Sequence, residues 1–338
     1  MENNGTLPDS YFNAVFDSFL ILLSVAVIAV NLLVISLFVC REYLQTKTNS
    51  LLISLAVSDL LVGLLGIPMN VICNAFLDVG VCMAAALIYR FIAVSTIYHI
   101  LLVTLERYIY VMYPMKYINI VTVPRLLTVI AAVWIFSLFA ALIQLAWLDP
   151  SNFFYQTKTP EEIRFDVGYH IFGSVFCFFL PAIIMAYSYV RMFLVIHRQI
   201  KEIQGLYNTR SAGHANQKAP IATEARALSI FAIMLTVFII CWLSFYVSGF
   251  LFAVLPGSEL VLSEKLFMAF DYIRFSVAFV NPFLYAFLKR DFSRALKSLC
   301  RRDGVQPGEL ASTASGSRFR TLTINFSLSR SSDMYRDA

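Results

Sequence analysis

The most regular feature of the chain is a series of long apolar segments separated by short polar stretches. Each segment has about 20 residues or more, enough for a helix to cross roughly 30 Å of hydrocarbon. The segments lie near residues 16–39, 49–73, 80–105, 126–148, 168–196, 227–255 and 266–288. The pattern therefore predicts an all-α membrane protein with a seven-transmembrane helix bundle.

Composition supports a lipid environment and gives no sign of an enzyme. Of 338 residues, 59% are hydrophobic and 14% are charged, which is too apolar for a soluble domain of this length. The sequence has no H-E-x-x-H zinc motif, its four histidines are scattered, and no serine or cysteine has a recognisable base partner. It has no internal repeat, which argues against transport. We predict a non-catalytic protein; a membrane enzyme or transporter is the weaker alternative.

The distribution of Lys and Arg predicts the orientation, because these residues accumulate in cytoplasmic connections. The opposite connections carry Lys158, Arg164 and Lys265. We therefore expect an extracellular N-terminus and a cytoplasmic C-terminus, and we attribute the net charge of +5 to this bias rather than to nucleic-acid binding. The cytoplasmic set is Arg41, Lys47, Lys116, Arg125, Arg191, Arg198, Lys201, Arg210, Lys218, Arg226, Lys289, Arg290, Arg294, Lys297, Arg301 and Arg302.

Polar and charged residues recur at defined places in the apolar segments, although a charge at bilayer depth costs roughly 2.5–3.5 kcal/mol. The pair Glu106-Arg107 ends the third segment, where the arginine can reach water. The full set of motifs, in chain order, is Asn31; Ser54-Leu55-Ala56-Val57-Ser58-Asp59; Glu106-Arg107-Tyr108, with Pro114-Met115-Lys116-Tyr117 after it; Trp134; Pro181 and Tyr189; and Asn281-Pro282-Phe283-Leu284-Tyr285.

These motifs resemble those of the rhodopsin-like, or class A, G-protein-coupled receptors, over nearly all of residues 16–302. The second segment, SLAVSDLLVGLLGIP, is similar to that of amine and adenosine receptors. The resemblance implies a multi-pass plasma-membrane receptor that transmits an extracellular small-molecule signal to a heterotrimeric G protein.

The resemblance also implies a charge switch at Arg107. In the family this arginine is held at rest by its adjacent acid, here Glu106, and in many members by an acid of span six, which Glu224 matches. When span six swings outward, the arginine is released toward the G protein, and tyrosines matching Tyr189 and Tyr285 turn inward. The sequence thus predicts a latch with two states; the alternative is a static salt bridge.

Asp59, Thr96 and Asn281 match a water-filled pocket of the family that often holds a sodium ion. Their oxygens would supply part of the ion's shell, and no other cofactor is expected. The chain has Val277 and Ala278 where family members often add polar groups. Interhelical hydrogen bonding without an ion is therefore the alternative.

The ligand cavity is expected near Tyr89, which lies five helical turns before Arg107 and shares its inward face. Amine-binding members of the family have an aspartate at this position, so Tyr89 argues against an amine receptor. Retinal binding needs a lysine midway along span seven, and the chain has none between Lys265 and Lys289.

Charged residues in the outer halves of the spans allow two interpretations. Arg274 pairs internally with Asp271 at i, i+3 spacing, with Arg90 turned toward a loop or headgroup. Alternatively, one arginine captures the anionic group of a small anionic or zwitterionic ligand. Aromatic side chains, with one histidine, would then pack around the ligand body: Trp242, Phe245, Tyr246, Tyr272 and His170.

Two positions depart from the family pattern. Span six has Ser244 where a proline normally follows Trp242, so the helix is expected to be straighter. The family usually links span three to the loop after span four, but residues 149–167 contain no cysteine. Cys82 either forms a bridge to Cys73 or both remain reduced. These departures raise a second function, a constitutive or partner-regulating seven-helix protein without a ligand.

The sequence also contains candidate modification sites and indicates how the chain is organised. Asn4 begins a glycosylation sequon, and Cys300, after the basic amphipathic stretch LKRDFSRALKSLC, is a candidate for palmitoylation. Cys40, Cys177 and Cys241 are expected to be small buried residues. The predicted parts are an extracellular N-terminus (1–15), the seven-helix bundle (16–288), an amphipathic eighth helix (289–301) and a disordered cytoplasmic tail (302–338).

The tail is rich in hydroxyl residues and resembles the phosphorylatable tails that recruit arrestin; the alternative is an unmodified polar tail. The residues concerned are Ser312, Thr313, Ser315, Ser317, Thr321, Thr323, Ser327, Ser329, Ser331 and Ser332.

Overall fold

The computed structural model describes residues 12–147, 159–209, 264–288 and 290–301, together with single positions between 229 and 246. By internal contacts the chain separates into two units, residues 1–296 and 297–338. The first unit contains the helices that carry the candidate sites. Of the second unit, the structure describes only the end of helix α11 (Arg290–Arg301).

The described elements of the first unit are helical. They are α1 (Ala14–Cys40), η1 (Glu42–Leu44), α2 (Lys47–Leu61), η2 (Val62–Gly66), α3 (Ile67–Phe76), α4 (Val79–Met112), α5 (Pro114–Ile120), α6 (Val123–Leu142), η3 (Ile143–Ala146), α7 (Pro160–Ser174), η5 (Val175–Phe179), α8 (Leu180–Thr209), α10 (Glu264–Leu288) and the first turns of α11.

Side-chain caps define where several of these helices begin. Asn13 accepts hydrogen bonds from the first backbone N–H groups of α1, and Asp78 caps α4 in the same way. Thr159 and Glu162 form a capping box at the start of α7. Each cap satisfies backbone donors that have no partner inside the helix.

Five stretches of the described chain are long and apolar enough to cross a membrane: Ala14–Cys40, Lys47–Phe76, Val79–Met112, Val123–Ala146 and Pro160–Gln199. They correspond to the first five predicted spans, although the fifth begins earlier than expected. The predicted sixth span lies largely outside the described residues. The seventh corresponds to α10, a helix of 25 residues whose apolar character is interrupted by Asp271, Arg274 and Asn281.

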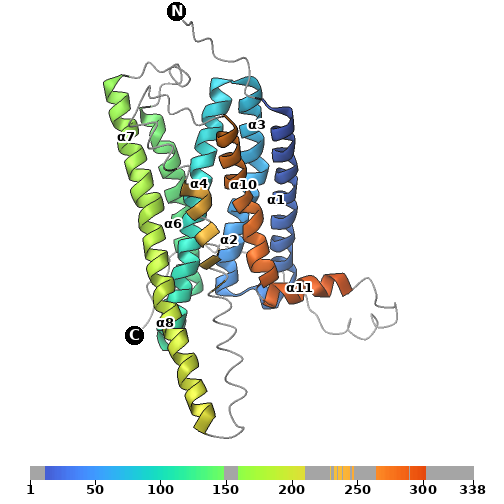
Figure 1. The fold of residues 1–338 in the computed structure, drawn as a ribbon, viewed down its shortest axis with the longest axis vertical. Helices are drawn as coiled ribbons and strands as arrows, with labels where there is room; N and C mark the ends of the chain where they lie inside the picture. The colour runs from blue at the N-terminus through green and yellow to red at the C-terminus, as the bar shows by residue number, and fades with distance from the viewer. Residues whose placement is uncertain are drawn as a thin grey trace, which may run out of the picture. The chain divides into compact units, whose positions relative to one another are not determined.

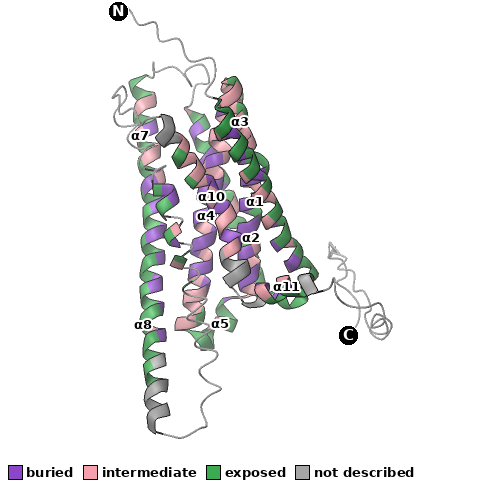
Figure 2. Ribbon diagram, turned by 45° about the vertical axis from the view of Figure 1, so that its right-hand side comes forward, coloured by how far each residue is buried: buried purple, intermediate pink, exposed green. Residues whose placement is uncertain are grey.

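Helix α4 is the centre of the packing, because it contacts α2, α6 and α8. Both ribbon views place α1 and the α7–α8 stretch on opposite flanks, with α4 and α10 between them (Figures 1 and 2). Buried residues run along α2 and α4, which contact each other, while many residues of α1 and α8 are exposed (Figure 2). The functional side chains of α4 therefore point into a packed interior.

Small residues allow α1 to approach the π-helical turn η2 closely. A Cβ atom on Gly63 would lie 2.8 Å from the Cγ1 atom of Ile28, and Ser24 Oγ donates a hydrogen bond to the Gly63 carbonyl at 2.7 Å. Glycine at an interhelical contact is typical of membrane helices. It brings α1 near Asp59, which lies one turn before Gly63 on the same span.

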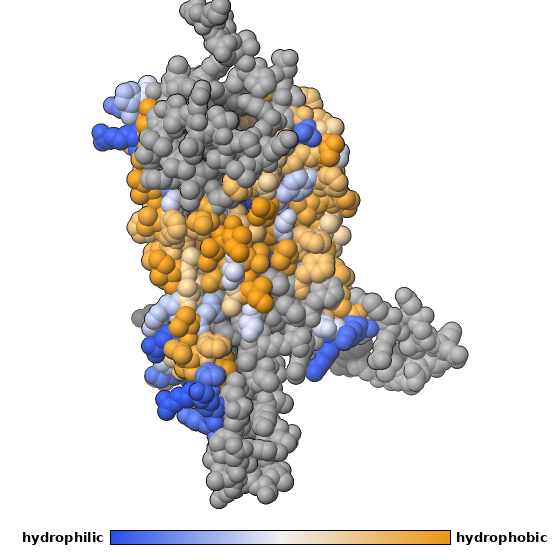
Figure 3. All heavy atoms as spheres, in the orientation of Figure 1, coloured by the Kyte–Doolittle hydropathy of each residue, from blue (hydrophilic) through white to orange (hydrophobic). Residues whose placement is uncertain are grey.

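The outer surface of the helices is strongly apolar. Val15, Phe19, Leu22, Ile183 and Phe193 are among its exposed large side chains, and Figure 3 shows apolar residues forming a belt above a cluster of hydrophilic ones. Such an extended patch would be a liability in water but is required against lipid.

Candidate functional site

The charged pair predicted at the end of the third span is joined to a second helix. Arg107 Nε lies 3.1 Å from Glu106 Oε2, and Thr48 of α2 donates a hydrogen bond to Glu106 Oε1 at 2.8 Å. The Arg107 guanidinium in turn donates to Thr48 Oγ1. The three side chains thus close a ring that ties α4 to α2.

Tyr117 of α5 completes this arrangement. Its hydroxyl donates to Glu106 Oε1 at 2.6 Å. Burial, together with the hydrogen bond to Glu106, raises the pKa of the Tyr117 phenol above its usual value, so the phenol remains a proton donor at neutral pH. We call Thr48, Glu106, Arg107 and Tyr117 the Arg107 latch.

Of the other predicted members of the switch, the structure describes the side chains of Tyr189 and Tyr108. Tyr189 is buried, and its hydroxyl lies 2.8 Å from Thr104 Oγ1 of α4. The ring of Tyr108 contacts that of Tyr113 with centroids 6.5 Å apart. Glu224 and the side chain of Tyr285 lie outside the described residues.

Deeper in the bundle, Asp59 is paired with span seven. Asn281 Nδ2 lies 3.2 Å and 3.5 Å from the two Asp59 carboxylate oxygens. Asn31 Nδ2 donates to the carbonyl groups of Val27 and Ala278 at 2.9 and 3.1 Å. These bonds connect α1, α2 and α10 in the manner expected for polar residues that join membrane helices.

Asp59 also lines a small cavity, which we call the Asp59 cavity, whose residues fit a sodium ion poorly. Asp59 and Thr96 supply oxygen, but the remaining lining is apolar except for Tyr89, Trp242 and the guanidinium of Arg274; it also contains Val62, Ile92, Phe275, Val277 and Ala278. A hard cation needs several oxygen ligands. Here one carboxylate is already bonded to Asn281, and a fixed positive side chain shares the space.

Arg274 reaches this cavity while paired with an acid on its own helix. Its Nη2 lies 2.6 Å from Asp271 Oδ1, and its guanidinium carbon lies 3.6 Å from the centroid of the Tyr89 ring. Tyr89 contacts Trp242, with ring centroids 5.3 Å apart. The structure thus contains the internal Asp271–Arg274 pair, the first of the two interpretations drawn from the sequence.

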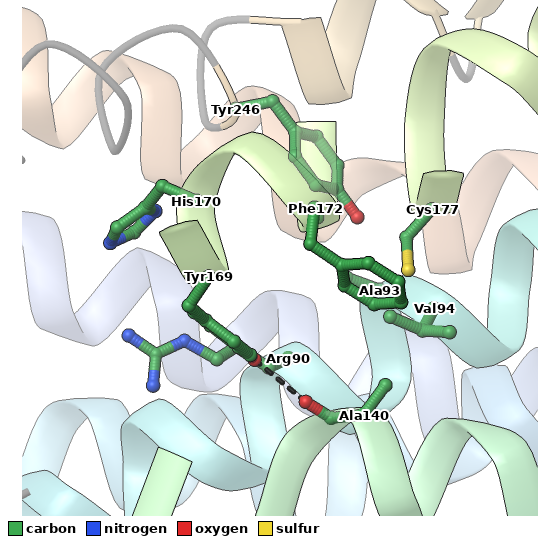
Figure 4. Close-up of a pocket in the computed structure, with 10 residues that line it drawn as sticks. Arg90, Ala93, Val94, Ala140, Tyr169, His170, Phe172, Cys177 and Tyr246 are labelled. Atoms are coloured by element: carbon green, nitrogen blue, oxygen red, sulfur yellow. Dashed lines mark hydrogen bonds between the residues drawn. The ribbon is translucent and has the colours of Figure 1, made fainter. Parts of the chain in front are cut away.

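A second and larger cavity lies between α4, α6, α7 and η5, with about 460 Å³ of empty space. We call it the Arg90 cavity (Figure 4). It contains Arg90, which the same interpretation had turned toward a loop or headgroup. The lining consists of Arg90, Ala93, Val94, Ala140, Tyr169, His170, Phe172, Gly173, Cys177 and Tyr246.

Not all predicted ligand-binding residues enter these cavities. Tyr272 belongs to neither lining. It packs edge-on against Phe16 of α1, with centroids 4.7 Å apart, and its hydroxyl donates to the Phe16 carbonyl at 2.7 Å. One position along α10 from Asp271 turns this side chain toward α1, and a role of Tyr272 in ligand binding stays a prediction. Phe245 lies outside the described residues.

The cysteines divide into bridged, buried and exposed residues. A disulfide joins Cys73 at the end of α3 to Cys82 at the start of α4. Cys177 and Cys241 are buried, whereas Cys40 is exposed. The prediction of a buried Cys40 was wrong, because this residue ends α1 on its outer face. Asn4 and the side chain of Cys300 lie outside the described residues.

Sequence reasoning missed three partners that the structure supplies. Thr48 is an ordinary polar residue at the start of a helix, and Tyr169 is one of 17 tyrosines. The sequence around each of them contains no motif that would mark it as a functional residue. His99 is one of the four scattered histidines of the sequence; it is buried and hydrogen-bonded to Ser54. Such partners become visible only when the rotation of each helix is known.

Comparisons with known proteins agree with this geometry. A family model described as "7 transmembrane receptor (rhodopsin family)" matches residues 30–285. The chain is 26% identical over 325 residues to the histamine H2 receptor of Cavia porcellus, covering 89% of this chain and 85% of the relative. It is 28% identical over 301 residues to the Homo sapiens histamine H2 receptor (83% and 78% covered). It is 26% identical over 332 residues to the Homo sapiens alpha-1D adrenergic receptor (81% and 55% covered).

Proposed function

The chain belongs to the rhodopsin family of seven-transmembrane receptors, and we propose that it uses the Arg107 latch to pass an extracellular small-molecule signal to a heterotrimeric G protein. The family consists of receptors, so its members act on nucleotide exchange in another protein rather than by catalysis. The observation that supports this use of the latch is the double role of Glu106. Its carboxylate restrains Arg107 while bonding to α2 and α5.

The latch has the properties that a two-state switch needs. Glu106 is buried, so breaking its pair with Arg107 has a substantial cost unless the guanidinium gains another acceptor. A G protein that offers such acceptors would bind only the open state and would shift the population toward it. A ligand bound nearer the other end of α4 needs only to favour the same state.

We propose that the end of the bundle with the Arg107 latch faces the cytoplasm of a cell whose plasma membrane holds the receptor. The excess of Lys and Arg in the connections at this end supports the orientation. On the same grounds we propose that Asn4 is extracellular and available for glycosylation.

We also propose two events on the cytoplasmic side. Phosphorylation of the hydroxyl-rich tail would create a negatively charged segment for arrestin. Palmitoylation of Cys300 would anchor the end of the basic amphipathic stretch in the bilayer. Both proposals rest on sequence.

The direct test is nucleotide exchange with purified components. We expect the receptor, reconstituted in lipid nanodiscs, to accelerate GDP release from at least one Gα subtype in a panel, and Arg107→Ala to remove this acceleration. The substitution deletes the side chain that the open state presents. Nanodiscs without receptor are the control, and GDP release that equals this control for every Gα, with and without candidate ligands, would contradict the proposed function.

A second expectation concerns sodium. Because Val277, Ala278 and Arg274 occupy the space around Asp59, replacing sodium with potassium at constant ionic strength should leave ligand-free GDP release unchanged. A dose-dependent fall of GDP release with sodium would show that the Asp59 cavity holds the ion after all.

A further inference from the structure

We propose that the Arg90 cavity binds the carboxylate of a small aromatic acid, with the guanidinium of Arg90 as the anion receptor. The inference deepens the proposed receptor function and rests on it for the signalling role of the ligand. Binding itself depends only on the cavity.

The two arginines in the outer half of the bundle differ in how their charge is balanced. Arg274 forms an ion pair with Asp271 at 2.6 Å. Among the described residues, no ion pair joins Arg90 to a carboxylate. Asp166 of α7 lies near enough to stabilise the Arg90 charge electrostatically, but its Oδ1 accepts hydrogen bonds from Trp147 at 2.9 Å and from Gln144 at 3.5 Å. Arg90 therefore retains donors for an incoming anion.

The Arg90 side chain is positioned by its contact with the ring of Tyr169. Its guanidinium carbon lies 5.4 Å from the centroid of the Tyr169 ring, within the range of a cation–π contact. The Tyr169 hydroxyl donates to the Ala140 carbonyl at 2.7 Å, which fixes the ring between α6 and α7. Figure 4 shows this bond, and shows His170 and the Arg90 guanidinium on the same side of the cavity.

The remainder of the lining suits a flat apolar body. Ala93, Val94, Phe172 and Cys177 line it, and Tyr246 brings a phenol hydroxyl toward Phe172 (Figure 4). The cavity opens toward solvent, and its empty space of about 460 Å³ includes that open part. An aromatic acid can place its ring in this part and its carboxylate on Arg90, since planar guanidinium groups bind carboxylates through two parallel hydrogen bonds.

The same lining disfavours a cationic ligand. The described lining residues include no aspartate or glutamate. An ammonium group in the cavity would therefore meet the Arg90 charge directly, while the carboxylate of Asp166, which stabilises that charge, lies outside the lining. The inferred ligand class therefore differs from the one suggested by the names of the histamine and adrenergic relatives.

Cys177 provides a native reporter for the test, because its free thiol lines the cavity. The purified full-length receptor is treated with two thiol reagents of similar size, anionic sulfonatoethyl methanethiosulfonate and cationic trimethylammonioethyl methanethiosulfonate. Peptide mass spectrometry measures the rate at Cys177 and separates it from the other free cysteines. We expect the anionic reagent to react faster, and Arg90→Gln to lower the anionic-to-cationic rate ratio at least about tenfold.

Three further variants make the result specific. Arg90→Lys keeps the charge and should keep the preference for the anionic reagent. Arg164→Gln removes an exposed arginine from the same α7 helix and should leave the ratio unchanged. Arg274→Gln tests the other arginine. The proposal is overturned if Cys177 does not react, if Arg90→Gln leaves the ratio unchanged, or if the ratio depends on Arg274 instead.

Protection by a ligand-like probe completes the test. 3-Phenylpropionate should slow modification of Cys177 by a neutral methanethiosulfonate, and should do so much less in Arg90→Gln. The neutral 3-phenylpropanamide should protect weakly in both proteins, and equal protection by acid and amide would overturn the proposal. Neither measurement involves a G protein. Arg90-dependent binding without GDP release would therefore count against the receptor function alone, and the converse result against the cavity alone.

Discussion

Glu106→Gln should raise ligand-independent G-protein activation above that of the unmodified receptor at equal surface expression. The substitution keeps the size of the side chain and one oxygen for Thr48 and Tyr117, removes the charge that restrains Arg107, and replaces the oxygen nearest Arg107 Nε by an amide NH2 group. Opposite charges about 4 Å apart attract each other by roughly 4 kcal/mol at an effective dielectric constant near 20, and the released guanidinium regains part of this from its new surroundings. Since about 1.4 kcal/mol is tenfold in an equilibrium, we expect about a tenfold larger active population.

The measurement is energy transfer between Gα and Gβγ in cells without added ligand, with surface expression followed by an N-terminal tag. Tyr117→Phe and Thr48→Val each remove one neutral hydrogen-bond partner of Glu106. Both should give smaller increases of basal activity in the same assay. Glu224→Ala, the change suggested by the sequence, shows whether span six contributes as well. Basal activity of Glu106→Gln equal to that of the unmodified receptor would remove the latch.

Ser54→Ala should lower the thermal stability of the receptor more than removal of the Thr48 or Tyr117 hydroxyl does. Ser54 Oγ lies 2.7 Å from His99 Nε2 and accepts a hydrogen bond from Trp134 Nε1 at 3.1 Å. His99 Nδ1 lies 2.7 Å from the Ser95 carbonyl, which can only accept, so Nδ1 carries the proton and Nε2 accepts from Ser54. One hydroxyl therefore joins α2, α4 and α6.

Removing this hydroxyl leaves the buried His99 imidazole and the half-buried Trp134 indole N–H without their partner. Interhelical hydrogen bonds in membranes contribute roughly 0.6–1.7 kcal/mol each, so losing both should cost about 1–3 kcal/mol. The melting temperature of the purified receptor, followed by thiol-reactive dye or light scattering, measures the effect. Ser50→Ala is the matched control on α2, because the half-buried Ser50 donates its hydrogen bond to the Thr46 carbonyl of its own turn. Equal melting temperatures for the two variants would contradict the role of this network.

The spans and the charge pair could be predicted from sequence because they depend on local patterns. An apolar run long enough for a bilayer is visible without knowing its neighbours, and Glu106 and Arg107 are adjacent in the chain. The helix termini were less predictable. The fifth span begins at Pro160 because Thr159 and Glu162 cap it, whereas hydropathy alone placed the start near residue 168.

The partners across helices could not be predicted in the same way. Spacing along α4 indicates that Arg107 and Tyr89 share a face, but not that Thr48 of α2 meets that face. The two arginines illustrate the same difficulty. Asp271 and Arg274 are three residues apart, so their pairing was one expected outcome, whereas the contact of Arg90 with Tyr169 depends on how α7 is rotated against α4.

The central claim is that the released guanidinium of Arg107 activates the G protein. The most direct measurement compares GDP release from a responsive Gα by nanodisc-reconstituted Glu106→Gln receptor and by the double variant Glu106→Gln/Arg107→Ala. We predict fast release with the single variant and release at the rate of empty nanodiscs with the double variant. Equal, accelerated release with both would show that the receptor is switched by something other than this arginine.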